Sequence, residues 1–469
     1  MSGEIKAGLE IHQQLNTHKL FCDCPSVLRK DDAEFEVRRR LHAVAGESGE
    51  VDIAAKHEAE QDKEFIYEGY DTTCLVELDE EPPHLINEEA LETALHIALL
   101  LNCEILPIAQ IMRKTVVDGS NTSGFQRTVL IARDGWVETE KGRVGINAIM
   151  LEEDSARPNS GGNDAEGEES TKVYKLDRLG LPMVEIATDP DITSPEQAKE
   201  VALHIGDVLR SCKVRRGIGT IRQDVNVSIE GHPRIEIKGF QDVKMFIPTV
   251  EKEVKRQEGN LKGKKDLIGQ VRNALSDGSS EFIRPMPGAA RMYPETDLPL
   301  LRISKQMIDE AKRTLPKLRS ELKVDLIKKG LRDDEIQILL KGDNLDDFNN
   351  LLKIINEPRF IYKVLIEIPK QVGDLDMDII ESIVYAVDNG KLDRLDVRQV
   401  MQDIVNGKSL EEALIIEKAD IGDVESEIVK LVKEKPGLSV GGYMGLIMQK
   451  FKGKVNGKEV NAILNKLLK

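Results

Sequence analysis

Carboxylates and one histidine interrupt apolar runs that are typical of strands. These polar side chains are the first candidates for catalysis or metal binding. Glu185 lies within the apolar run 183–186, where a carboxylate is costly to bury unless a positive charge meets it. Glu10 and His12 lie two residues apart in the run 5–15, so a strand places them on the same face. Each side chain either lies on a solvated strand face or points towards a bound cation.

The acidic triplet 152–154 follows another apolar run, 144–151, and concentrates negative charge at its end. These side chains are either solvated, or one or two of them coordinate a divalent cation. The segment 220–229 alternates polar and apolar residues, as on the wet side of a sheet or the wall of a cleft. Mostly oxygen donors with one imidazole suit Mg²⁺ or Mn²⁺ better than zinc, and such an ion commonly binds nucleotide phosphates. ATP-dependent phosphoryl transfer is therefore one chemistry open to Glu10, His12, Glu152, Glu185 and Asp224.

Three cysteines form a second group of metal-binding residue types: Cys22, Cys24 and Cys74. Three thiols fall short of the paired Cys-x-x-Cys sets that indicate a zinc site. The sequence therefore favours buried free thiols over a zinc ion at these positions. Five cysteines in 469 residues do not make a disulfide framework, and they fit a reducing compartment.

Composition and missing motifs narrow the class of protein. A formal net charge of −17 argues against a general nucleic-acid coat but allows a local basic surface, at 210–216 or along the C-terminal lysines. The chain has no apolar run of transmembrane length and no secretory start, so we expect a cytoplasmic protein without membrane contact. The sequence contains no P-loop, dinucleotide-binding, zinc-protease or hydrolase-elbow motif.

The elements that must position these residues change in character along the chain. Strand patterns dominate the first part, whereas apolar residues at helical spacing dominate from about residue 304 onwards. We expect an α+β fold with a mixed catalytic domain over 1–300, a helical domain over 301–415 and a helical tail over 416–469.

Local patterns predict several element boundaries. Gly180 and Pro182 predict a turn before the Glu185 strand, and Asn87 and Ser194 are expected to cap the helices that follow them. Three further predictions concern the second half of the chain. We expect Gly259 to end the charged helix 249–258 and one helix to span 307–319. We expect the proline-rich segment 284–299 to be irregular.

Three longer motifs surround the candidate residues. They read Gly-Leu-Glu-Ile-His-Gln-Gln-Leu at 8–15, Met-Leu-Glu-Glu-Asp at 150–154 and Leu-Asp-Arg-Leu-Gly-Leu-Pro-Met-Val-Glu at 176–185. Together they resemble the B/E family of tRNA-dependent amidotransferases. The segments 222–228 and 441–464 match as well, and 284–297 points to the E branch.

The resemblance implies a cradle-shaped catalytic domain followed by a helical domain and a small helical tail. It also implies an ATP-dependent carbon–nitrogen ligase that works in two steps. ATP phosphorylates the side-chain carboxylate of glutamate on Glu-tRNA(Gln), and ammonia then displaces the phosphate to give Gln-tRNA(Gln). A partner of amidase or asparaginase type, by resemblance the D subunit of the complex, would release ammonia from glutamine or asparagine within a heterotetramer. No covalent nucleophile of the enzyme is expected.

The resemblance also implies roles for individual residues at the matching positions. His12, Glu152 and Glu185 are expected to hold Mg²⁺ or Mn²⁺, with Glu10 close by as a further ligand. Polar side chains of neighbouring strands are expected to line the same cleft. The catalytic residues that the resemblance implies are Glu152, Glu185, Asp224 and Lys238.

One departure from the family concerns tRNA recognition. The E branch usually carries a large insertion resembling part of bacterial aspartyl-tRNA synthetases, whereas this chain has only the short connection 259–279. Two alternative functions stay open: a B-type subunit that also acts on Asp-tRNA(Asn), and a tRNA-binding scaffold without an active site. Because phosphate contacts position a nucleic acid without reading its sequence, tail lysines are expected to contact the tRNA backbone. These are Lys450, Lys452, Lys454 and Lys458.

Overall fold

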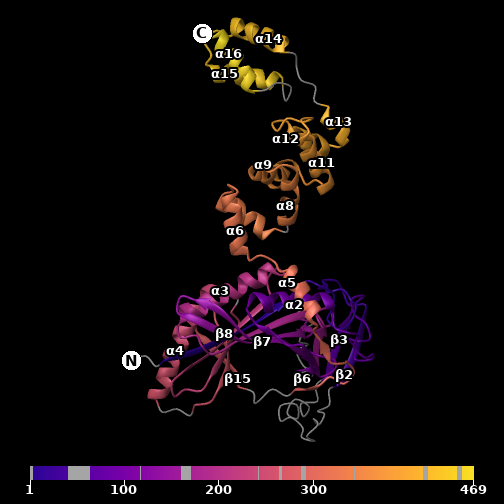
Figure 1. Ribbon diagram of the computed structural model, residues 1–469, viewed down its shortest axis with the longest axis vertical. Helices are drawn as coiled ribbons and strands as arrows, with labels where there is room; N and C mark the ends of the chain where they lie inside the picture. The colour runs from indigo at the N-terminus through magenta and orange to yellow at the C-terminus, as the bar shows by residue number, and fades with distance from the viewer. Residues whose placement is uncertain are drawn as a thin grey trace. The chain divides into compact units, whose positions relative to one another are not determined.

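The chain divides into two compact units, Met1–Arg319 and Ser320–Lys469 (Figure 1). The first combines sheets with helices and the second is helical, which confirms the predicted α+β class. The finer division into three domains stays a prediction. The structure is a computed structural model that describes residues 4–40, 64–116, 118–159, 171–240, 242–263, 267–286, 292–342, 344–415, 421–451 and 457–468.

A mixed sheet of 11 strands forms the centre of the first unit. Strand β1 (Ile5–Gln14) lies in its middle and runs antiparallel to both β11 (Pro182–Thr188) and β12 (Ile221–Ile229). Beyond β11 follow β8 (Gly142–Glu153) and β7 (Phe125–Thr139), again antiparallel. The patterns at 5–15, 144–151, 183–186 and 220–229 predicted strands, and these correspond to β1, β8, β11 and β12. The strand order is β15-β14-β13-β12-β1-β11-β8-β7-β6-β16, and β4 pairs with β7.

Shorter strands complete this sheet and form two smaller ones. The large sheet also contains β4 (Glu104–Ile105), β6 (Ile111–Thr115), β13 (Ile235–Lys238), β14 (Gln270–Ala274), β15 (Ser280–Pro285) and β16 (Met292–Pro294). A four-stranded sheet consists of β2 (Phe35–Arg40), β3 (Glu64–Gly69), β10 (Thr171–Lys175) and β9 (Arg157–Pro158). The pair β5 (Ile108–Ala109) and β17 (Leu301–Arg302) forms the third sheet.

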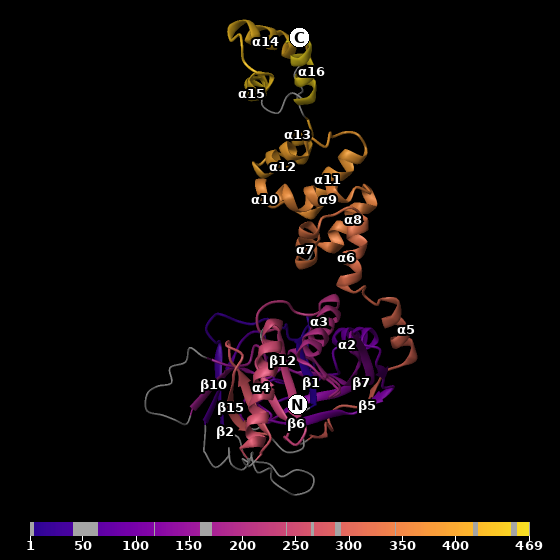
Figure 2. The ribbon, with the colours of Figure 1, turned by 90° about the vertical axis from the view of Figure 1, so that its left-hand side faces the viewer.

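The two faces of the large sheet have different surroundings. Helices α2 (Glu88–Leu100), α3 (Pro195–Ser211) and α4 (Phe246–Lys262) cover one face (Figures 1 and 2). Because side chains alternate along a strand, Leu9 and Ile11 of β1 enter the apolar core beneath these helices. Glu10 and His12 therefore lie on the opposite face. The helix starts confirm the predicted caps, since Asn87 accepts from Ala90 and Ser194 from Gln197.

The second unit consists of helices and contains two separate apolar clusters, over 326–414 and 424–464. Its helices are α6 (Arg319–Lys328, which begins at the boundary), α7 (Asp333–Lys341), α8 (Leu345–Ile354), α9 (Pro358–Tyr362), α10 (Pro369–Val372), α11 (Met377–Asp388), α12 (Val397–Val405), α13 (Leu410–Leu414), α14 (Ile421–Glu434), α15 (Val440–Lys450) and α16 (Gly457–Leu467). A π-helical turn, Lys363–Glu367, joins α9 to α10.

Three boundary predictions were wrong. Helix α4 continues through Gly259 and ends at Lys262, with Gly263 as its C-cap, because a glycine within a helix weakens it without breaking it. The helix predicted over 307–319 stops at Arg313, and this α5 (Lys305–Arg313) precedes Pro316, which cannot donate a backbone hydrogen bond. Segment 284–299 contains β16 and the end of β15, because prolines are tolerated at the ends of edge strands.

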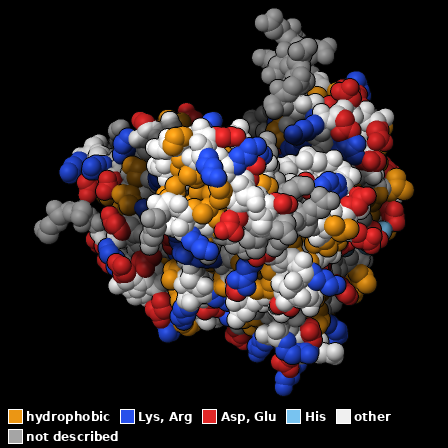
Figure 3. Space-filling view, turned by 90° about the horizontal axis from the view of Figure 1, so that it is seen from above, with side chains coloured by type: hydrophobic (Ala, Val, Ile, Leu, Met, Phe, Trp, Pro, Cys, Tyr) orange, Lys and Arg blue, Asp and Glu red, His pale blue; other side chains and the backbone are white. Residues whose placement is uncertain are grey.

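The surface mixes charges of both signs. Figure 3 shows Lys and Arg side chains interspersed with Asp and Glu over the face drawn, with hydrophobic side chains between them. None of the helices in the described ranges combines the length and the apolar character needed to cross a bilayer.

Candidate functional site

The candidate site lies on the face of the large sheet opposite the helices, where β1, β11 and β8 run side by side. Strand register places His12 of β1 beside Glu185 of β11. Gly180, with a positive φ of 83°, makes the predicted turn that leads into β11. Glu152 lies near the end of β8, so donors far apart in the sequence meet on one face.

The imidazole of His12 lies at the centre of this group. Its Nε2 donates to Glu185 Oε2 at 3.2 Å and lies 3.6 Å from both Glu10 Oε1 and Glu152 Oε1. One ligand atom from each of Glu10, His12 and Glu185 falls within 4.8 Å of the others, a spacing at which all three can reach one ion. The structure therefore brings together all four predicted metal ligands. We call Glu10, His12, Glu152 and Glu185 the sheet-face centre.

Glu152 carries the clearest sign of a cation site. Only 1% of the residue is exposed, and neither side-chain oxygen has a hydrogen-bond partner. Burial, followed by the negative charge of Glu185, raises the pKa of Glu152 to about 7. A buried carboxylate without hydrogen bonds is costly, and a bound cation would remove that cost. The residues present thus fit the divalent ion that the donor types predicted.

Glu185 is buried as well, so the solvated alternative for this residue is wrong. Burial by itself would raise its pKa, but the His12 hydrogen bond and the charges of Lys114 and His12 outweigh burial and lower the pKa to about 2. Burial likewise acts to lower the pKa of His12, yet the hydrogen bond and charges of the surrounding carboxylates raise it. The arrangement favours an ionised Glu185, which is the protonation state that a metal ligand needs.

Sequence reasoning missed Lys114, which belongs to this centre. It extends from β6, and its Nζ lies 3.5 Å from Glu185 Oε2 and 3.6 Å from Glu152 Oε2. Lysines in short strands are mostly exposed, so the segment 111–115 carries no pattern that would have distinguished this one.

The remaining predicted catalytic residues lie on the other side of β1. Asp224 of β12 is the strand neighbour of Glu10, and Lys238 of β13 binds Asp224 Oδ2 at 2.7 Å and Glu236 Oε1 at 2.6 Å. Burial acts to lower the pKa of Lys238, but the two carboxylates raise it. Asp224 and Lys238 thus continue, across β12 and β13, the row of charged side chains that begins at the sheet-face centre. Their catalytic roles stay predictions.

The side chains of the acidic triplet lie in different surroundings, because Glu152 and Glu153 alternate at the end of β8 and Asp154 follows the strand. Glu153 accepts from the backbone nitrogen of Arg127 at 3.0 Å, and Asp154 accepts from Gln14 at 2.7 Å and Arg222 at 3.1 Å. All three acids are buried, which excludes the solvated alternative. Only Glu152 reaches the sheet-face centre.

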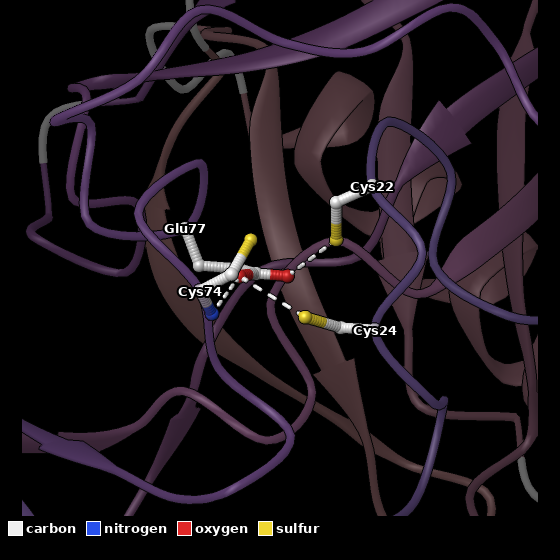
Figure 4. Close-up of side chains that lie close together, drawn as sticks. All are labelled: Cys22, Cys24, Cys74 and Glu77. Atoms are coloured by element: carbon white, nitrogen blue, oxygen red, sulfur yellow. Dashed lines mark hydrogen bonds between the residues drawn. The ribbon is translucent and has the colours of Figure 1, made fainter.

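The three predicted cysteines come together with a fourth donor that the sequence did not reveal. Figure 4 shows Cys22 and Cys24 extending from one loop towards Cys74 and Glu77 on another. One ligand atom from each lies within 4.8 Å of the others. The Cys22 thiol donates to Glu77 Oε1 at 2.9 Å, and the buried Lys19 ammonium lies 3.0 Å from the same oxygen. We call these four donors the cysteine cluster.

Sharing of protons within the cysteine cluster makes one thiol acidic. Hydrogen bonds from the other two thiols lower the pKa of Cys24 to about 4. Hydrogen bonding to its neighbours raises the pKa of Cys22, with burial adding to the effect. Burial raises the pKa of Glu77. Three thiols and a carboxylate that compete for protons at close range are donors that a thiophilic ion would bind.

The predicted tRNA-binding lysines are described only in part. Lys450 ends α15 and forms an ion pair with Glu427 of α14. Lys452 and Lys454 lie outside the described residues, and so does the side chain of Lys458 in α16. Their contact with tRNA stays a prediction.

Comparison with known proteins identifies the family. The family model described as "GatB/GatE catalytic domain" matches residues 5–309. The E subunit of glutamyl-tRNA(Gln) amidotransferase from Methanocaldococcus jannaschii is 36% identical over 626 aligned positions, which cover 99% of this chain and 98% of the relative. The chain belongs to the GatB/GatE family.

Two further relatives of this GatB/GatE family member carry the same name. The one from Pyrobaculum arsenaticum is 33% identical over 98% of both chains, and the one from Archaeoglobus fulgidus is 32% identical over 99% of this chain and 98% of the relative. The family match includes every residue of the sheet-face centre. The alignments span more than 600 positions, whereas this chain has 469 residues, so the relatives contain sequence without a counterpart here.

Proposed function

We propose that this chain is the E subunit of a glutamyl-tRNA(Gln) amidotransferase and that the sheet-face centre activates the substrate. In the first step, a side-chain carboxylate oxygen of tRNA-bound glutamate attacks the γ-phosphorus of ATP, which gives an acyl phosphate and ADP. In the second, the nitrogen of ammonia attacks the acyl carbon, phosphate leaves and the nitrogen loses a proton. The observation that supports this site is the buried carboxylate of Glu152, which accepts no hydrogen bond and lies beside His12 and Glu185.

We propose that His12, Glu152 and Glu185 hold Mg²⁺ or Mn²⁺, with Glu10 completing the set from its more exposed position. When bound, the ion would neutralise charge that develops on the transferred phosphoryl group. Family membership implies the use of ATP, and the donor set favours an oxygen-preferring ion. The Lys238 ammonium, which Asp224 and Glu236 bind, places a positive charge on the far side of β1 from Glu185.

The ammonia is proposed to come from a second chain. The names of the relatives describe a subunit, which implies an assembly of more than one chain. A partner of amidase or asparaginase type, the D subunit of the complex, would supply ammonia within a heterotetramer.

We also propose that the cysteine cluster binds Zn²⁺ through Cys22, Cys24, Cys74 and Glu77, against the preference of the sequence for free thiols. Four donors at close range from two loops suit a closed structural site. The buried Lys19 would offset part of the negative charge that three thiolates and a carboxylate bring. Metal analysis of the purified full chain tests this: one zinc per chain is expected, and none in the Cys24→Ser variant.

Product formation with free ammonia tests the main proposal. The full chain is incubated with Mg-ATP, Glu-tRNA(Gln) and ammonium chloride, beside the Glu185→Ala variant and a matched control, Glu104→Ala, at an exposed carboxylate of β4. Gln-tRNA(Gln) is expected from the wild type and the control but not from Glu185→Ala. Equal activity in all three would place the reaction elsewhere on this chain. No product from the wild type, even after an amidase-type partner is added, would favour the scaffold alternative. Equal amidation of Asp-tRNA(Asn) would favour the B-type alternative.

A further inference from the structure

We infer that Lys114 is a built-in counter-ion of the sheet-face centre, which a divalent cation displaces and so frees to meet the anionic substrate. The inference rests on the proposed function, because it assigns a positioning role within the same site. No sequence motif indicated Lys114. Its ammonium lies at long distances from the carboxylates that surround it.

The distances around Lys114 are long for an ion pair. Its Nζ lies 3.5 Å and 3.6 Å from carboxylate oxygens of Glu185 and Glu152, and no closer carboxylate contact occurs within the described residues. Lys238, on the other side of the same row, lies 2.6 Å and 2.7 Å from its two carboxylates. Charge-assisted hydrogen bonds are usually about 2.7–2.9 Å long. Lys114 thus compensates charge without being fixed by short hydrogen bonds.

The neighbouring residue shows that the strand itself is fixed. Arg113 points to the other side of β6 and binds the buried Glu295 through two nitrogens, at 2.5 Å and 2.9 Å. Arg127 of β7 binds the same carboxylate at 2.9 Å. These contacts hold the backbone of β6 in place. Any displacement at this position is therefore confined to the Lys114 side chain, which is 35% exposed and has a flexible four-carbon stem.

The balance of charge favours displacement when an ion arrives. Three carboxylates, those of Glu10, Glu152 and Glu185, surround the position where an ion would lie. A divalent cation offers them twice the charge of one ammonium, and the two cations repel each other. The ion would therefore take over the carboxylates and leave the Lys114 ammonium without its counter-charge. The anionic group that reacts at this centre, a nucleotide phosphate, is then its nearest available partner.

Binding of Mn²⁺ to the full chain without substrate tests this inference. Free Mn²⁺ is measured by electron paramagnetic resonance in the wild type and in Lys114→Met, Lys114→Gln and Lys114→Arg, at pH 8. We expect the two uncharged variants to bind Mn²⁺ at least about fivefold more tightly, because a competing cation is gone. Lys114→Arg retains the charge and should bind within about twofold of the wild type. His12→Ala identifies the site and should bind Mn²⁺ far more weakly.

Several results would overturn the inference. Unchanged or weaker Mn²⁺ binding in both uncharged variants would mean that the ammonium does not compete with the ion. Tighter binding in Lys114→Arg as well would mean that shape, not charge, matters. Mn²⁺ binding that survives His12→Ala would place the ion elsewhere. Because Mn²⁺ binding needs no turnover, failure of the proposed reaction would leave this result intact, and the two outcomes stay distinguishable.

Discussion

The sheet-face centre and the cysteine cluster each gather four donors and one lysine, yet they differ in openness. The donors of the sheet-face centre come from three strands, and 30% of the Glu10 side chain and 14% of the His12 side chain are exposed. The donors of the cysteine cluster come from two loops, and its Lys19 is fully buried. Structural metal sites are closed, whereas catalytic sites keep an open position. This difference agrees with the roles proposed above, an open site for turnover and a closed site for stability.

The two lysines show the same difference. Lys19 lies 3.0 Å from Glu77 and donates to the carbonyl oxygen of Leu176 at 3.3 Å, so it is fixed by packing and hydrogen bonds. Lys114 lies at longer distances and is partly exposed. A fixed counter-ion suits a permanent ion, and a loosely held one suits an ion that arrives with a substrate.

The largest expected effect follows from removing the central donor of the sheet-face centre. His12→Ala should lower the rate of Gln-tRNA(Gln) formation on the order of a thousandfold, which corresponds to about 4 kcal/mol. It should also lower the melting temperature, because the buried Glu185 loses the hydrogen bond and the charge of His12, so activity is measured at a temperature at which the variant is folded. His204→Ala on α3 is the matched control and should retain activity. A His12→Ala enzyme as active as the wild type would contradict a catalytic role for the sheet-face centre.

The next effect concerns stability. Cys24→Ser should remove about 2–3 kcal/mol of unfolding free energy from the zinc-bound chain, since it breaks the closed site. Activity of the molecules that stay folded should be retained. Thermal melting beside Cys103→Ser, a free cysteine outside the cluster, measures the difference. Equal melting temperatures for the two variants would remove the structural role of the cysteine cluster.

A smaller effect of opposite sign is expected at Glu152. Glu152→Gln should stabilise the chain in EDTA by about 1–2 kcal/mol, because it replaces a buried carboxylate that has no hydrogen bond. The same substitution should weaken the rise in melting temperature that Mg²⁺ gives the wild type. Melting curves with and without Mg²⁺ test both effects. A loss of stability in EDTA would show that the charges of His12 and Lys114 outweigh the cost of burying this carboxylate.

The smallest effect lies in the helical tail. Lys450→Ala should weaken tRNA binding by less than about 1 kcal/mol and lower the salt dependence of binding by less than about one counter-ion, because Glu427 already neutralises this lysine. A filter-binding series over salt concentration measures it. A loss above roughly tenfold would mean that Lys450 leaves Glu427 to bind phosphate.

The sequence revealed much of the sheet-face centre but not its lysine. Glu10, His12 and Glu185 interrupt apolar strands, so period-two alternation was enough to place them on strand faces. Their convergence depends on β1, β11 and β8 becoming neighbours, which only the family resemblance indicated. Lys114 has no such pattern, because a lysine near a strand end is ordinarily solvated.

The cysteine cluster shows a second limit. A carboxylate as the fourth donor lies outside the cysteine spacings that indicate zinc, and Glu77 is 55 residues from Cys22. The two helix ends that were predicted wrongly have different causes. Glycine and proline both disfavour helix, but α4 packs against the sheet and continues through Gly259. Helix α5 stops before Pro316, earlier than predicted.

The most direct test of the central claim isolates the first step. ADP formation is measured with the full chain, Mg-ATP and Glu-tRNA(Gln) in the absence of any ammonia source, for the wild type and for Glu185→Gln. The account predicts tRNA-dependent ADP formation in the wild type and a loss on the order of a hundredfold or more in the variant. Equal ADP formation in both would contradict the assignment of carboxylate activation to the sheet-face centre.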